Sequence, residues 1–160
     1  MNFKIRVINK NDKDWIKKYI TREWGSNRVV NRGKIYLASE LPGFIAEKDG
    51  QYLGLLTYNL ENHNCEIITL NSLKAGEGIG TALIDEIKNL VKENHCQRLW
   101  LITTNNNLSA IEWYKKQGFK IKAIYKNSME ISRKLKPQIP LVDDKGVPIK
   151  DEIEMELQLK

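Results

Sequence analysis

The feature that most constrains this chain is the junction at residues 73–81, where a glycine-rich loop separates two kinds of hydrophobic periodicity. Before the loop, runs over residues 43–47, 52–60 and 65–70 are separated by turn residues, which predicts three consecutive antiparallel strands. After it, apolar residues recur at helical spacing over residues 79–93, which predicts an amphipathic helix. The chain must therefore pack helices on a sheet, as a mixed α/β or α+β domain does.

The flanking segments extend this pattern on both sides. The predicted elements are a strand over residues 3–7, a helix from Asn11 or Asp12 to Gly25, a strand over 98–103, a helix over 108–117 with Asn107 as its N-cap and Gly118 as its stop, and a strand over 119–125. Residues 26–41 fit either a short helix or a loop, followed by an extended segment over 34–38. An irregular connection over 133–150 then leads to a closing strand over 151–159, which we expect at the sheet edge.

Length and composition indicate one globular domain over residues 1–160. Hydrophobic residues make up 41% and charged residues 29% of the chain, which is typical of a folded protein. No apolar run approaches the roughly 20 residues that span a bilayer, and the first residues lack a signal-peptide pattern. We therefore expect a cytoplasmic protein with no membrane partner.

The cysteine and histidine content argues against a metal centre. The candidate ligands are His63, Cys65, His95 and Cys96. Their spacing matches no common metal pattern, and His63 and Cys65 would point to opposite faces of a shared strand. We expect no metal and, with two cysteines, no disulfide framework.

The net charge of +6 suits a polyanionic partner, but a mildly basic chain is common. The charges are scattered, and aromatic residues such as Trp15 and Trp113 fall in helical patterns instead of interleaving a basic stripe. We therefore expect no nucleic-acid partner.

The loop itself predicts an anion site. Gly76, Gly78 and Gly80 let the backbone turn tightly and approach a ligand, and the following helix offers free N–H groups suited to a diphosphate. The sequence lacks the Lys-Ser or Lys-Thr of a P-loop and the third glycine of a dinucleotide-binding fingerprint. A glycine-rich turn that binds nothing stays open on the loop alone.

Two motifs together resemble the GNAT N-acetyltransferase family. Gly78-Ile79-Gly80 resembles the end of the family's cofactor loop, although Ala75 stands where the family has glutamine or arginine. The segment from Asn107 through Ala110 and Tyr114 to Gly118-Phe119 matches the family pattern at every fixed position. The resemblance implies a GNAT-type acyl-CoA N-acyltransferase fold, with a central, mostly antiparallel sheet flanked by helices.

The same resemblance implies an acetyl-CoA-dependent acetyltransferase whose acceptor is a small-molecule or protein amine. The implied cofactor-binding residues are Leu70, Ser72, Leu73, Gly76, Glu77, Gly78, Ile79, Gly80, Thr81 and Asn107. Lys74 is a further candidate contact for a phosphate.

For the chemistry, the resemblance implies Tyr114 as proton donor to the leaving thiolate. An amine must lose a proton before it attacks, and Glu66 is the leading candidate base. The alternative is that Glu66 is a solvated strand residue without a catalytic role. Glu61 and Glu47 are other candidate bases, and a water relay with no single base is a further way to remove the proton. A non-catalytic acyl-CoA-binding module of the same fold is the alternative function.

The sequence gives the least information about the acceptor site. Trp24, Tyr36 and Tyr58 could line it or pack in the core. The basic segment over residues 126–136 fits a solvated linker or a short helix, or else a lid or wall over the acceptor site or a contact with a CoA phosphate. An edge strand near the C-terminus would also leave a homodimer open.

Overall fold

The computed structural model describes residues 2–159 and contains a seven-stranded sheet in the order β1-β4-β5-β6-β7-β9-β8. Its strands are β1 (Lys4–Val7), β4 (Gly43–Lys48), β5 (Gln51–Glu61), β6 (Asn64–Ser72), β7 (Arg98–Thr104), β8 (Lys120–Tyr125) and β9 (Glu152–Gln158). The helices are α1 (Lys13–Trp24), α2 (Ile79–Glu93), α3 (Leu108–Lys116) and α4 (Met129–Leu135). Among the strands that the structure describes, only β6 and β7 pair in parallel, which confirms the predicted, mostly antiparallel sheet.

The predicted meander is present and is closed by tight turns. Asp49 and Gly50, between β4 and β5, have φ values of 51° and 78°. Asn62 and His63, between β5 and β6, likewise have φ values of 52° and 64°. Positive φ at both central residues suits the right-handed twist of a two-residue hairpin, so local turn chemistry sets the order of these strands.

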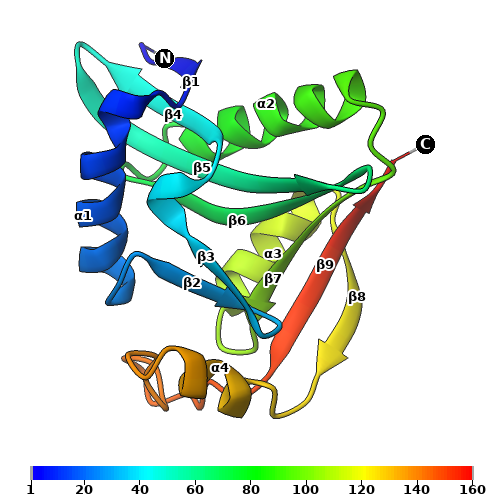
Figure 1. The fold of residues 1–160 in the computed structure, drawn as a ribbon. Helices are drawn as coiled ribbons and strands as arrows, with labels where there is room; N and C mark the ends of the chain where they lie inside the picture. Colours follow the sequence, from blue (N-terminus) through cyan, green and yellow to red (C-terminus); the bar gives the residue numbers. More distant parts are fainter. Residues whose placement is uncertain (1, 160) are drawn as a thin grey trace.

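Helices cover both faces of the sheet, with α1 on one face and α2 and α3 on the other (Figure 1). The α2 face buries the larger apolar cluster, which includes Leu83, Ile87, Leu99, Phe119 and Met155. The α1 face buries a second cluster, which includes Ile16, Ile20, Ile45 and Leu55. No helix among residues 2–159 is both long and apolar enough to cross a bilayer.

The sheet opens between its two parallel strands. β6 and β7 are paired only from Asn64 and Arg98 to Ile67 and Leu101, although both strands continue beyond that point. The register between β5 and β6 shifts at the same level, because Thr57 faces Thr69 whereas Tyr58 faces Ile67. A bulge bends and twists a strand locally, so β6 turns away from β7 (Figure 1).

The expectation of a short helix or loop directly after α1 was wrong. That region contains a two-stranded hairpin made of β2 (Arg28–Asn31) and β3 (Lys34–Leu37), and a 3₁₀ turn over Ala38–Glu40 follows. Its turn places Arg32 at φ 51°. Glu152 accepts a hydrogen bond from the Arg32 backbone N–H at 2.8 Å, and the Arg32 guanidinium lies 3.5 Å from the Tyr125 ring centroid. Contacts with residues far away in the sequence therefore hold the hairpin, and no local sequence pattern predicts it.

The expected position of the closing strand was also wrong. β9 lies between β7 and β8, so the edge strand on this side is β8. The long connection after β8 allows this, because the chain leaves the sheet through α4 before it returns as β9. α4 also runs to Leu135, inside the stretch over residues 133–150 that was expected to be irregular.

Candidate functional site

The glycine loop forms one wall of a surface cavity of about 590 Å³, called the loop cavity below. Gly76 and Gly78 adopt left-handed φ values of 77° and 75°, and Gly78 is the N-cap of α2. No side chain caps this helix end. The N–H groups of its first turn therefore remain available to an anion.

Gly76 and Gly80 have different roles in the loop. A Cβ added at Gly76 would meet no heavy atom within 4 Å, so open space lies in front of the loop there. A Cβ at Gly80 would lie 3.1 Å from the Trp113 ring, so Gly80 allows α3 to approach the start of α2. The left-handed backbone, the uncapped helix end and the open space together fit a diphosphate.

A second cavity, of about 600 Å³, occupies the opening between β6 and β7 and is called the central cleft below. Ile67, Ile68 and Leu70 of β6 form one side, and Leu101 to Thr104 of β7 form another. Its remaining walls come from α1, β2, α3, α4 and the connection before β9. The central cleft and the loop cavity share Leu70, Ala110 and Tyr114, so the two spaces meet at these residues.

Tyr114 stands at that junction. Its ring packs edge-on against Trp113 at 5.1 Å and Phe119 at 5.6 Å between centroids, which fixes its orientation. Burial alone raises the pKa of the Tyr114 phenol well above its ordinary value. The hydroxyl therefore keeps its proton at neutral pH and can act as a proton donor.

Glu66 is a buried strand residue, and the solvated alternative is wrong. Its side chain is 4% exposed, and its carboxylate accepts hydrogen bonds from the Tyr36 hydroxyl at 3.1 Å and the Asn31 amide at 3.2 Å. Desolvation raises the pKa of Glu66 to about 7, and the two hydrogen bonds partly oppose that rise. A carboxyl with this pKa can accept a proton near neutral pH.

Glu66 does not line the central cleft. It borders a polar hollow of about 260 Å³ beneath the β2–β3 hairpin, together with Arg32, Lys34 and Arg98. Asn31 lines both this hollow and the central cleft. Asn31 therefore lies at the boundary between the hollow that holds Glu66 and the central cleft.

Most of the other residues implied for the cofactor line the loop cavity. Ser72, Gly76, Gly78, Ile79, Gly80 and Thr81 line the loop cavity, as does Lys74. Leu73 and Glu77 do not line it, and the Leu73 N–H donates to the Leu53 carbonyl at 2.8 Å.

Asn107 lines the central cleft and holds the N-cap position of α3, but its side chain makes no cap hydrogen bond. Its amide nitrogen instead lies 3.2 Å from the hydroxyl oxygens of both Thr103 and Thr104. This side chain ties α3 to the end of β7 and does not cap the helix.

The other candidate bases and acceptor-site residues are divided between the central cleft and other parts of the fold. Glu61 pairs with Lys34 at 2.9 Å, and Glu47 pairs with Arg6 at 2.7 Å, both outside the central cleft. Trp24 lines the cleft, whereas Tyr36 binds Glu66 and Tyr58 stacks on Phe44 at 6.0 Å between ring centroids.

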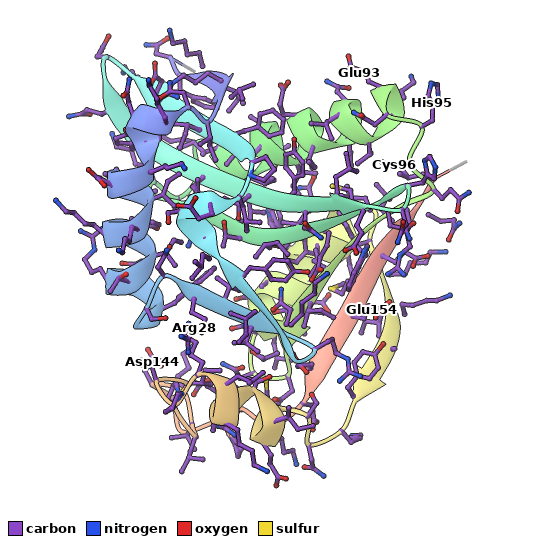
Figure 2. The ribbon with its side chains drawn as sticks, viewed as in Figure 1. Arg28, Glu93, His95, Cys96, Asp144 and Glu154 are labelled. Carbon is purple, nitrogen blue, oxygen red and sulfur yellow. The ribbon has the colours of Figure 1, made fainter. Side chains whose placement is uncertain are left out.

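The candidate metal ligands give no cluster. Cys65 and Cys96 are buried free thiols. His95 and Cys96 lie at the C-terminal end of α2, opposite the end that meets the loop (Figure 2). Among residues 2–159, no three histidine, cysteine, aspartate or glutamate side chains are grouped to hold a metal ion.

Three side chains of the site were missed in the sequence. Asn31 comes from the unpredicted hairpin, Trp113 was placed in a helical pattern without a link to Gly80, and Lys136 stood among other lysines of a basic segment. Lys136 follows α4 with the non-helical backbone angles φ −142° and ψ 86°, so helical periodicity could not have placed it, and no local signal separates it from the other lysines of the segment.

The comparisons with known proteins agree with this architecture. The family model described as Acetyltransferase (GNAT) family matches residues 11–119. An uncharacterized protein of Bacillus subtilis (strain 168), YdhI, is 40% identical over 136 residues, which cover 84% of this chain and 85% of that protein.

Two solved structures show a similar fold. An IAA acetyltransferase from Bacillus cereus ATCC 14579 aligns with a TM-score of 0.72 at 18% identity, covering 99% of this chain and 100% of that one. A GNAT family acetyltransferase from Elizabethkingia anophelis with acetyl-CoA bound gives a TM-score of 0.71 at 18% identity, covering 99% of each chain. With the splayed parallel strands and the glycine loop already in place, the family match over most of the chain establishes that this protein belongs to the GNAT acetyltransferase family.

Proposed function

We propose that this chain is an N-acetyltransferase that moves an acetyl group from acetyl-CoA to an amine by direct attack in a ternary complex. The observation that carries the proposal is the meeting of the loop cavity and the central cleft at Leu70, Ala110 and Tyr114. A donor held by the loop and an acceptor held in the cleft would face one another there. Bound acetyl-CoA would supply the acetyl thioester.

The loop residues have the binding role. The N–H groups at the start of α2 and the left-handed turn at Gly76 and Gly78 would hold the diphosphate. Beyond Ile67, β6 has no β7 partner, so backbone groups near Leu70 and Ser72 are free to bind the pantetheine amides. Lys74 lines the same cavity and would contact a phosphate.

Glu66 and Tyr114 have the proton-transfer roles. An ammonium acceptor would give a proton to the Glu66 carboxylate through water beside Asn31, which frees the nitrogen lone pair for attack. As the new carbon–nitrogen bond forms and the carbon–sulfur bond breaks, the Tyr114 hydroxyl would protonate the departing sulfur. The second proton that the nitrogen loses in becoming an amide would return to the Tyr114 oxygen. Backbone N–H groups in the unpaired part of β6 would stabilise the charge on the carbonyl oxygen.

A non-catalytic acyl-CoA-binding module has less support. Such a module needs no proton acceptor, yet Glu66 is buried with a pKa of about 7. A buried titratable carboxyl lowers stability when it ionises, which is hard to explain without a use for it.

The proposal is tested by two measurements on the wild-type protein. Free-thiol release from acetyl-CoA is followed with a panel of amines, and thermal stability is followed with CoA and with DNA. We expect amine-dependent thiol release and stabilisation by CoA. Stabilisation by CoA without thiol release from any amine supports the binding module, and stabilisation by DNA alone contradicts both functions.

A further inference from the structure

The central cleft is lined by a buried lysine that has no part in the proposed chemistry. Lys136 directly follows α4 and is 5% exposed, and it lines the cleft together with Met129 of that helix. A lysine buried to this extent is costly unless an anion or several acceptors lie near its ammonium group.

The described residues give this ammonium no carboxylate partner. Burial lowers the pKa of Lys136, and the nearby Arg28 guanidinium lowers it further, with no acidic group opposing either effect. Arg28 reaches from β2 toward α4, where it donates a hydrogen bond to the Leu135 carbonyl at 2.9 Å (Figure 2). Two cations are therefore held near one another beside the cleft.

Glu23, which also lines the cleft, is not an ion-pair partner of Lys136. Glu23 lines the cleft, but its side chain is 44% exposed and lies 3.5 Å from the Arg22 guanidinium. The cleft therefore has an electropositive end at Lys136, while Glu66 lies behind Asn31 in the separate hollow.

The surfaces beside Lys136 are apolar. The cleft residues of this kind include Trp24, Val29, Met129, Ile139 and Pro140. A ligand that fits here needs an apolar body as well as a group that binds the ammonium.

A group bound in the loop cavity would not contact Lys136. Lys74 and the start of α2 line the loop cavity, whereas Lys136 lines the central cleft only. An anionic group held against Lys136 would therefore lie in the central cleft and not against the glycine loop.

We propose that the acceptor is an amine that also carries an anionic group, a carboxylate or a phosphate, on an apolar body, and that Lys136 binds the anionic group. This inference rests on the proposed function, because the acceptor is placed in the central cleft. The amine would face Tyr114 while the anionic group contacts Lys136 in the same cleft.

The test uses product-like probes that differ only in charge. N-acetyl-leucine, its phosphonate analogue and the neutral N-acetyl-leucinamide are titrated calorimetrically into the wild-type protein, with and without CoA. A charge-assisted contact predicts that at least one anionic probe binds roughly 10- to 100-fold more tightly than the amide. Equal affinities, or no binding by either anionic probe, would overturn the inference.

Two variants identify the residue responsible. Lys136→Met keeps an unbranched side chain in the buried position and should abolish the preference for anionic probes. Lys134→Met removes the same charge from an exposed residue of α4 and should leave the preference intact. A preference that survives in Lys136→Met contradicts the assignment.

The CoA titration separates the two possible failures. Normal CoA affinity in the wild type and in both variants, with no anionic preference, refutes the acceptor inference alone. Failure of the wild type to bind CoA contradicts the proposed function, and the probe comparison without CoA still reports on Lys136.

Discussion

The Tyr36 hydroxyl donates a hydrogen bond to Oε1 of Glu66 at 3.1 Å, which joins the β2–β3 hairpin to the central strand β6. Asn31, on the other strand of the hairpin, donates to Oε2 of the same carboxylate at 3.2 Å. The hairpin therefore both covers Glu66 and connects it to the central cleft.

The first prediction concerns pH. Burial raises the pKa of Glu66 to about 7, and only the deprotonated carboxylate can accept a proton, so activity should rise as the pH increases through about 7. Glu66→Gln should lower turnover by roughly 100-fold or more and remove this rise. Initial rates of thiol release between pH 5.5 and 9 measure both effects.

A matched control for that experiment is Glu61→Gln, which neutralises an exposed carboxylate that pairs with Lys34. It should keep the wild-type pH profile. An unchanged profile in Glu66→Gln as well would remove Glu66 from the chemistry.

The second prediction concerns the Tyr36 hydrogen bond. This bond stabilises the ionised form of Glu66, so Tyr36→Phe should raise the pKa of Glu66 and move the rise in activity to higher pH. A net bond worth about 0.5–1.5 kcal/mol corresponds to a displacement of roughly 0.4–1 pH unit. A profile displaced to lower pH, or not displaced, would be inconsistent with the role of this contact.

The third prediction concerns Tyr114. Tyr114→Phe keeps the ring that packs on Trp113 and Phe119 but removes the proton donor. Turnover should fall by roughly 100-fold while the dissociation constant for CoA changes less than about threefold. Tyr58→Phe, in a ring that stacks on Phe44, should leave turnover near the wild-type value. Wild-type turnover in Tyr114→Phe would assign the leaving-group proton to another donor.

The fourth prediction concerns the anion site at the start of α2. Thr81 is exposed in the first turn of this helix and lines the loop cavity. Thr81→Glu would repel the diphosphate, yet a negative charge at a helix N-terminus is favourable by about 0.3–1 kcal/mol. We therefore expect CoA affinity to fall at least tenfold without loss of thermal stability.

Thr81→Gln is the control for the Thr81→Glu experiment, because it has a side chain of similar size without the charge. CoA affinity close to wild type is expected in this variant. Equal affinities in the two variants would place the diphosphate away from α2.

The sequence predicts the elements whose geometry is set by neighbouring residues. Asp49-Gly50 defines the hairpin between β4 and β5, and the helical spacing that begins at Ile79 defines α2. The glycine loop and the segment that contains Tyr114 could be predicted for the same reason, because each is a local sequence pattern that determines local structure.

The parts that could not be predicted depend on contacts between distant residues. The β2–β3 turn is fixed by Glu152, 120 residues from Arg32 in the sequence. The burial of Glu66 depends on that hairpin, so a strand pattern alone could not show it. β9 was misplaced because its alternating pattern is compatible with an edge or an interior position, and only its pairing with β7 and β8 decides between them.

The most direct test of the whole account is a crystal structure of the wild-type protein with acetyl-CoA bound. The account predicts the diphosphate against the N–H groups of Ile79 to Thr81, and the thioester between β6 and β7 beside Tyr114. A cofactor bound elsewhere, or a thioester remote from Tyr114, would contradict it.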